Sequence, residues 1–221
     1  MVTAVIGMKQ DSQRVKNKNF KILGEKPLFA WIIDTLLEVN EIGEILLNIQ
    51  GKNLIDLILE KYSYESKLKI FEREKFLEGH ETPMTEIIGN TISNAKYQTI
   101  LNTHSTNPFL TSDSISTSLN NFKRNNLPLF SVNVFQSRFF DKNIKPINHN
   151  PKELLQTQEL DEIYEENSCF YIFNKDEFLK NKSRIFKNSI VFPLNKIESI
   201  DIDTNEDWQL AEVVARNLDL I

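Results

Sequence analysis

Glycine is scarce in this chain, and its scarcity excludes the glycine-rich nucleotide-binding loops. The 221 residues include six glycines, where ordinary usage would give roughly fifteen. No segment matches GxGxxG, and Gly7 is followed five residues later by Ser12 instead of the second glycine of a P-loop. If the protein binds phosphates, groups other than a glycine-lined loop must hold them.

Three further shortages narrow the class of protein. Cys169 is the single cysteine, so an internal disulfide is excluded, and no apolar run is long enough to span a membrane. The net charge is −5, which gives no general attraction to nucleic acid or anionic lipid. The first residues also lack the pattern of a secretory signal. We therefore expect a cytoplasmic protein without nucleic-acid or membrane partners.

The residues that are present have the composition of a folded domain. Hydrophobic residues make up 40% of the chain and charged residues 26%, which is too apolar for a disordered protein. At this length a single domain is the simplest expectation, and such a domain buries about 70% of its unfolded surface. We expect residues 1–221 to form one domain.

Short apolar segments alternate with amphipathic ones along the chain. The pattern predicts strands at 3–8, 44–49, 67–71, 98–103, 129–134, 169–173 and 190–193. It predicts helices at 28–39 with Pro27 in the first turn, at 53–62 with Asn53 as N-cap, at 112–124 after Thr111 or Ser112, and near 83–95, 175–179 and 206–218. This alternation is typical of an α/β fold with a doubly wound, mainly parallel sheet. Ligands of such sheets lie beyond the carboxyl ends of the strands.

One long polar segment interrupts the alternation. Residues 135–161 contain prolines, asparagines and a histidine, and apolar residues resume only near Cys169. A connection of this length without its own apolar pattern is unusual inside a domain. We interpret it as an arm or dimerisation insert.

The loop after the first predicted strand is the first candidate site. Residues 9–19 read KQDSQRVKNKN and include the cations Lys9, Arg14 and Lys18. At the carboxyl end of a strand, these side chains and nearby backbone N–H groups are suited to surround a triphosphate. The alternative interpretation is a solvated surface loop.

Two aspartates near the carboxyl end of the chain form the second candidate site. Asp201 and Asp203 alternate in the segment SIDIDT, so an extended backbone points both carboxylates to one side. Adjacent carboxylates repel unless a cation lies between them, and Mg²⁺ bridging a nucleotide satisfies this need. The alternative makes Asp203 or Thr204 a helix cap and leaves Asp201 on the surface.

His104 follows the fourth predicted strand in the polar segment THSTNP. It is a candidate contact for a substrate hydroxyl or carboxylate, with a structural or surface histidine as the alternative. His80 and His149 show no metal-ligand spacing, which argues against zinc. Cys169 lies in a predicted strand, where a buried structural cysteine is expected.

Together these segments resemble the acylneuraminate cytidylyltransferases, the CMP-sialic acid synthetase family. The resemblance is carried by KxxSxRVxxKN, GEKPLFAWII, THSTNPFLT, QTQELDEIYEENSCFYIF and, most specifically, SIDIDTNEDWQLAE. It implies a Rossmann-like nucleotidyltransferase fold and a homodimer. It also implies Mg²⁺-dependent transfer of CMP from CTP to an acidic nine-carbon sugar, a nonulosonic acid, with release of pyrophosphate.

The resemblance assigns roles by position. Phosphate and nucleotide contacts are implied for Lys9, Ser12, Lys18 and Asn19, and the metal site for Asp201 and Asp203. Contacts to the sugar are implied for His104, Asn167 and Tyr171. We expect Lys9, Arg14, Lys18, Asp201 and Asp203 to carry the catalysis.

The phosphate loop departs from the family pattern. Lys9 stands in place of arginine, Gln10 and Asp11 in place of glycines, Gln13 in place of lysine and Arg14 in place of glycine. Arg14 is expected to supply the displaced charge. Arginines that many members have near positions 157 and 165 are absent. Two alternatives follow from these departures, a nucleotidyltransferase for another acidic sugar and a nucleotide- or sugar-binding relative without full activity. A third alternative is a dimeric scaffold of the same fold.

Overall fold

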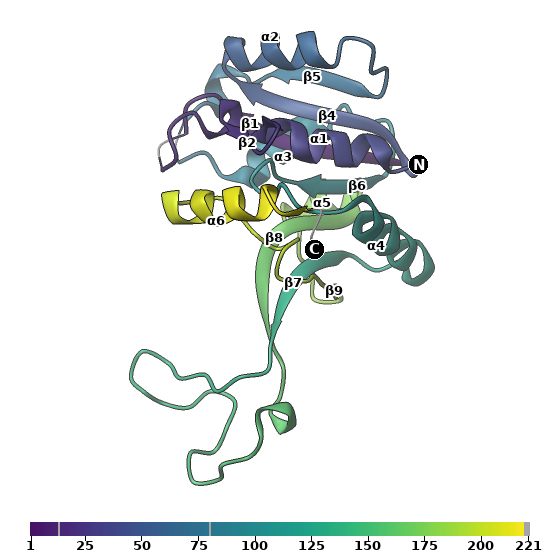
Figure 1. The fold of residues 1–221 in the computed structure, drawn as a ribbon. Helices are drawn as coiled ribbons and strands as arrows, with labels where there is room; N and C mark the ends of the chain where they lie inside the picture. Colours follow the sequence, from purple (N-terminus) through teal and green to yellow (C-terminus); the bar gives the residue numbers. More distant parts are fainter. Residues whose placement is uncertain (13, 80, 219–221) are drawn as a thin grey trace.

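A seven-stranded sheet is the centre of the protein in the computed structural model, which describes residues 1–12, 14–79 and 81–218 (Figure 1). The strands are β1 Val2–Lys9, β4 Ile42–Gln50, β5 Leu68–Glu72, β6 Thr99–Thr103, β7 Leu129–Phe135, β8 Ile163–Asn174 and β9 Ile190–Pro193. Their order is β5-β4-β1-β6-β8-β7-β9. Only β8 is antiparallel to its neighbours among these strands. The predicted α/β class and mainly parallel sheet are confirmed.

Helices cover both faces of the sheet (Figure 1). They are α1 Leu28–Glu38, α2 Lys52–Lys61, α3 Met84–Ile92, α4 Ser112–Asn125, α5 Lys175–Asn181 and α6 Asn205–Ala215. Along β1, Ala4 and Ile6 pack with α1, α2 and α4, whereas Val5 packs with α3 and α5. This alternation follows from the period of two in a strand and explains why β1 is apolar throughout. None of the helices in the described ranges is long and apolar enough to cross a membrane.

The helix starts differ slightly from those expected. Pro27 precedes α1 instead of lying in its first turn, and the N-cap of α2 is Gly51 instead of Asn53. The predicted cap at Thr111 is confirmed, because its side chain accepts a hydrogen bond from Ser114 N at 3.2 Å. The Gly51 cap needs a φ of 116°, which glycine adopts without strain.

A short hairpin follows the loop after β1. It pairs β2 (Ile22–Leu23) with β3 (Lys26–Pro27), and Gly24 has a φ of 63° in the turn. The hairpin packs with α6 in a separate apolar cluster that includes Leu23 and Trp208. The same cluster buries Val15 from the loop, so this packing fixes the loop against the sheet edge.

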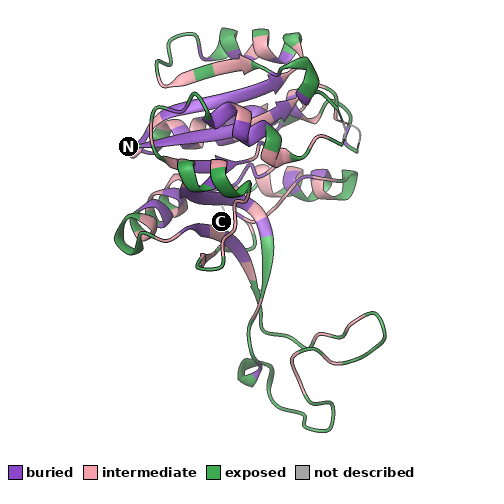
Figure 2. Ribbon diagram, turned by 180° about the vertical axis from the view of Figure 1, so that it is seen from behind, coloured by how far each residue is buried: buried purple, intermediate pink, exposed green. Residues whose placement is uncertain are grey.

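An arm between β7 and β8 extends away from the body of the protein (Figure 1). It contains the short 3₁₀ helix Thr157–Glu159, and most of its residues are exposed (Figure 2). Its exposed apolar side chains are Phe140, Ile144, Ile147, Leu154 and Leu155. The excursion predicted at 135–161 therefore has the form of an arm.

Candidate functional site

The carboxyl ends of β1 and β6 meet where the strand order reverses. From β1 the chain continues to β4 and β5 on one side, whereas β6 lies on the other side of β1. Open α/β sheets bind ligands at such a switch point. The backbone N–H of Ile202 donates to Thr106 O at 2.9 Å in the segment after β6. The segment with Asp201 and Asp203 therefore lies at this same edge of the sheet.

Polar side chains hold the loop over residues 9–19 in shape. The Ser12 hydroxyl accepts a hydrogen bond from Lys18 N at 3.0 Å, and Asn19 Nδ2 donates to Lys9 O at 2.8 Å. Hydrogen bonds between side chains and the backbone therefore hold the loop in shape, and the loop contains no glycine. The nucleotide contacts of Ser12 and Asn19 stay predictions.

Gln10, which occupies a glycine position of the family pattern, is accommodated by a glycine on the neighbouring strand end. Its backbone N–H donates to Gln50 O at 2.7 Å. A Cβ added to Gly51 would overlap the Gln10 side chain. The close approach therefore requires Gly51, and it allows the loop to begin with a residue larger than glycine.

Two loop cations converge on one aspartate. Arg14 Nη2 lies 2.8 Å from Asp203 Oδ1, and Lys18 Nζ lies 3.5 Å from the same oxygen. Lys18 Nζ also donates to Ile202 O at 2.6 Å. Burial lowers the pKa of Lys18, and the Asp203 carboxylate opposes this shift. The structure thus brings together a cationic loop and an aspartate that are far apart in the sequence, which favours the site interpretation over a solvated loop.

Asp201 has a buried oxygen without a partner. Its Oδ1 accepts no hydrogen bond from the described residues. Burial raises the pKa of this carboxyl, a side-chain hydrogen bond from Thr106 opposes the shift, and the neighbouring Asp203 carboxylate adds to it. A buried carboxylate oxygen without a donor is costly unless a ligand or cation compensates it. The unpaired oxygen therefore indicates a position for a ligand.

A divalent cation fits this pair of carboxylates. Magnesium is usually bound by one or two carboxylates together with substrate phosphates and water. Asp201 and Asp203 provide two carboxylates, and Asp201 Oδ1 provides an open donor atom. Within the described part of the chain, no group of three or more His, Cys, Asp or Glu residues encloses a metal. The donor set is suited to a cation that phosphate oxygens help to bind.

The helix cap next to this segment is Thr204. Its hydroxyl accepts from Asp207 N at 3.2 Å, and the Asp207 carboxylate accepts from Thr204 N at 2.7 Å. These reciprocal bonds form a capping box at the start of α6. The alternative interpretation is therefore correct for Thr204, but Asp203 is not the cap and its carboxylate faces the loop cations.

Arg73 is a buried cation that the sequence patterns did not reveal. Its Nε donates to Asn48 Oδ1 at 2.8 Å, and its Nη2 donates to Met8 O at 3.1 Å. Nη1 is buried and has no acceptor among the described residues. Burial, together with the Arg73 charge, lowers the pKa of Lys9, whose Nζ donates to Gly79 O at 3.2 Å. Lys9 and Arg73 thus form a second cationic group at the end of β1.

His104 and Tyr171 meet at a second arginine that was also missed. Tyr171 on β8 pairs with Asn102 on β6 across the antiparallel ladder. The Arg184 guanidinium lies 3.8 Å from the centroid of the Tyr171 ring and donates to Asn102 Oδ1 at 3.2 Å. Arg184 Nη1 also lies 3.3 Å from His104 Nε2. Two of the three predicted sugar contacts are therefore adjacent.

Asn167, the third predicted sugar contact, is hydrogen-bonded within the sheet. Its Oδ1 accepts from Ser131 Oγ at 2.6 Å, and its Nδ2 donates to Asn133 Oδ1 at 3.1 Å. These bonds join β7 to β8. A role in sugar binding stays a prediction for Asn167.

Cys169 is buried, and burial raises the pKa of its thiol, which supports the structural role expected for this cysteine.

We expect His104 to stay neutral at pH values where a free imidazole is charged. Burial, with the Arg184 and Lys18 charges, lowers the pKa of His104 to about 4. The lowered value means that His104 stabilises the fold fully above its unfolded pKa of about 6.5 and less as the pH falls toward 4. In an NMR titration, the resonance absent from the His104→Gln spectrum should not shift between pH 8 and about pH 5.5. A midpoint near 6.5 would contradict this prediction.

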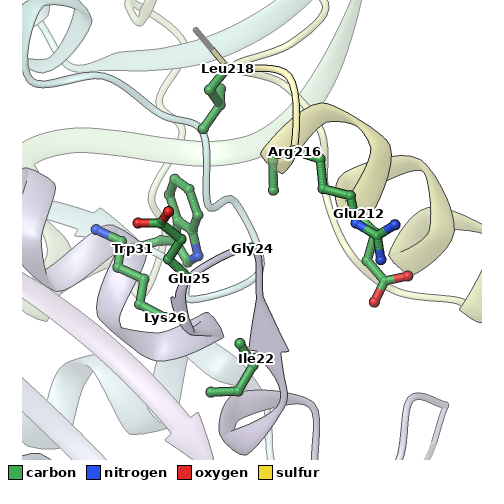
Figure 3. Close-up of a pocket in the computed structure, with 9 residues that line it drawn as sticks. Ile22, Gly24, Glu25, Lys26, Trp31, Glu212, Arg216 and Leu218 are labelled. Atoms are coloured by element: carbon green, nitrogen blue, oxygen red, sulfur yellow. The ribbon is translucent and has the colours of Figure 1, made fainter.

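A cavity of about 690 Å³ lies apart from these groups, between α1, the β2–β3 hairpin and α6 (Figure 3). Its lining includes the acids Glu25 and Glu212 as well as the bases Lys26 and Arg216. The opposite charges offer a triphosphate no net attraction. We therefore place the candidate site at the strand ends and not in this cavity.

The comparisons with known proteins show the family and agree with the fold. The model of the family described as "Cytidylyltransferase" matches residues 3–217. A CMP-N,N'-diacetyllegionaminic acid synthase of Legionella pneumophila is 26% identical over 96% of this chain and 94% of its own. A pseudaminic acid cytidylyltransferase of Campylobacter jejuni is 23% identical over 95% and 94%. A solved CMP:2-keto-3-deoxy-manno-octonic acid synthetase complexed with CTP has a TM-score of 0.68 at 11% identity, covering 96% of this chain and 97% of its own.

Proposed function

Because the chain belongs to the cytidylyltransferase family, we propose that it transfers CMP from CTP to a sialic-acid-like nonulosonic acid and releases pyrophosphate. The choice of sugar class is supported by the two relatives, whose names refer to legionaminic and pseudaminic acid. Both span nearly the whole chain. The convergence of Arg14, Lys18, Asp201 and Asp203 at the switch point of the sheet is the observation that carries the proposal.

The reaction is a displacement at the α-phosphate of CTP. The anomeric hydroxyl oxygen of the sugar bonds to the α-phosphorus, the α–β anhydride bond breaks, and the hydroxyl proton leaves for solvent. The main difficulty is to align two anions and to neutralise charge on the departing pyrophosphate. Arg14 offers the phosphates a planar fork, and Lys18 offers a point charge. Both cations already face the same atom of the site, Asp203 Oδ1.

We further propose that Asp201 and Asp203 hold Mg²⁺ during turnover. The cation would neutralise phosphate charge and lower the pKa of a bound hydroxyl. The protein's part is to hold the two carboxylates on one short, immobilised segment. Ile202 between them is buried, and its backbone is hydrogen-bonded to Thr106 O and to Lys18 Nζ, so the segment has little freedom to move.

We also propose that Lys9 and Arg73 contact the nucleotide. Both lie at the carboxyl end of β1, and Arg73 Nη1 is a buried donor without an acceptor among the described residues. Such a donor gains a full hydrogen bond when a nucleotide acceptor arrives. Lys9 adds charge next to it.

We also propose that the protein is a homodimer joined through the arm. The arm's apolar side chains are exposed to solvent, Leu154 to 88%, and Phe140 packs only edge-on against His149 of the same arm among the aromatic contacts of the described residues. Exposed apolar groups gathered on one projecting segment mark an interaction surface.

Pyrophosphate release is the direct test of the proposed function. The purified protein is incubated with CTP, Mg²⁺ and one of three sugars: N,N'-diacetyllegionaminic acid, pseudaminic acid or an N-acylneuraminic acid. We expect turnover with at least one sugar and none when CTP is replaced by ATP. Absence of turnover with every sugar would contradict the proposal, and calorimetric CTP binding without turnover would instead support a binding relative.

A further inference from the structure

We propose that Arg184 binds the carboxylate of the acidic sugar, and this inference rests on the proposed function. Arg184 comes from the connection between α5 and β9. Its guanidinium lies over the Tyr171 ring and bonds to Asn102, so its plane is held before any ligand arrives. A planar guanidinium with a fixed orientation is suited to bidentate binding of a carboxylate.

The hydrogen bonds of Arg184 leave donors free. Nη1 contacts Asn102 Oδ1 at 3.2 Å and His104 Nε2 at 3.3 Å. Among the described residues, neither Nε nor Nη2 donates a hydrogen bond, and Nη2 lies 3.9 Å from Glu166 Oε1. That distance gives charge attraction without a hydrogen bond. Part of the fork is therefore available to a stronger acceptor, and the Arg184 side chain is 20% exposed.

Arg184 also determines which ring nitrogen of His104 carries the hydrogen. A guanidinium has no acceptor, so His104 Nε2 must accept from Arg184 and carry no hydrogen. The remaining hydrogen of the neutral imidazole is then on Nδ1. His104 is thus a neutral donor beside the cation, a suitable partner for a sugar hydroxyl.

The position of Arg184 is close to the phosphate-binding groups. His104 Nε2 lies 3.3 Å from Arg184 Nη1, and two residues further along the same connection Thr106 O accepts a hydrogen bond at 2.9 Å from the backbone of Ile202, the residue between Asp201 and Asp203. Because one short connection carries both contacts, a sugar bound next to the α-phosphate would direct its carboxylate toward Arg184.

Glu166 is the group with which a sugar carboxylate would compete. Its carboxylate is 42% exposed, accepts a hydrogen bond from the Tyr171 hydroxyl and lies near Arg184. If Arg184 binds substrate, removal of the Glu166 charge should strengthen sugar binding, because it removes both a competitor and a repelling charge. If Arg184 only stabilises the fold, loss of the Arg184 charge and loss of the Glu166 charge should both weaken sugar binding.

The test compares a sugar acid with the methyl ester of its carboxylate, using the sugar that gives the highest turnover. In Arg184→Gln, we expect the KM for the acid to rise at least about tenfold, with the KM for CTP within about twofold of the wild type. The preference for acid over ester should fall by a similar factor. Glu166→Gln should lower the KM for the acid. Lys187→Gln, an exposed change in the same connection, is the matched control and should change neither constant.

Two results would overturn the inference. If Arg184→Gln kept the preference of the wild type for acid over ester, the carboxylate would be bound elsewhere, although the proposed function would stand. If the wild-type protein turned over no sugar acid, both the proposed function and this inference would fail. Arg184→Lys keeps the charge without the planar fork, so we expect an intermediate KM.

Discussion

Replacement of Asp203 by asparagine is expected to lower kcat for CMP transfer about 100- to 1,000-fold, the scale seen when one electrostatic group of an active site is removed. The substitution removes the carboxylate that faces both Arg14 and Lys18 and one of two proposed metal ligands. The measurement is steady-state pyrophosphate release at saturating CTP. Asp201→Asn should have an effect of similar size, because Asp201 supplies the unpaired buried oxygen.

The fold should survive this change. The Asp203 side chain is 36% exposed, and that of its partner Arg14 is 66% exposed, so their ion pair contributes at most about 1 kcal/mol to stability. Denaturant unfolding should therefore show a nearly unchanged free energy of unfolding. Glu206→Gln, an exposed acid in the first turn of α6, is the control and should retain activity. A folded Asp203→Asn protein with wild-type kcat would contradict the proposed site.

Conversion of the dimer to monomers is the second large effect that we expect. Ile144 and Leu154 are 76% and 88% exposed on the arm, and the combined Ile144→Asp and Leu154→Asp variant would place charges in the proposed interface. Burying an unpaired charge costs several kcal/mol, so the dimer dissociation constant should rise at least about 100-fold. Sedimentation velocity over a range of protein concentrations measures this constant.

A control variant distinguishes loss of the apolar interface from a general effect of added negative charge. Asn143→Asp adds a negative charge to an exposed arm position without removing an apolar side chain. It should leave the sedimentation behaviour close to that of the wild type. A wild-type protein that sediments as a monomer at tens of micromolar would exclude the proposed dimer. Because the arm projects from the sheet (Figure 2), the substitutions should not alter the stability of the body.

The local pattern was sufficient for most elements of the fold. Alternation in strands and helical spacing depend on neighbouring residues, so β1, β4 and α4 appear near their predicted positions. The β2–β3 hairpin was missed because strands of two residues are too short to show a period. The direction of β8 was also outside the reach of the pattern, since an apolar run reads the same in parallel and antiparallel pairing.

The two missed arginines show where sequence reasoning about the site fails. Arg73 contacts Met8 O across 65 positions of the chain, and Arg184 contacts His104 across 80. Neither belongs to a motif with a characteristic spacing. By contrast, the charges in the loop over residues 9–19 and in SIDIDT were visible because each group lies within one short segment.

By itself, the sequence determined the succession of strands and helices, the exclusion of glycine-lined phosphate loops, and the two charged segments suited to a triphosphate and a cation. Only the tertiary structure decided which charges face one another. Lys18 and Asp203 are 185 positions apart yet lie 3.5 Å apart at the switch point between β1 and β6. Hydrogen bonds and ion pairs act over a few ångströms, so their partners are set by the order and direction of the strands, which no local pattern specifies.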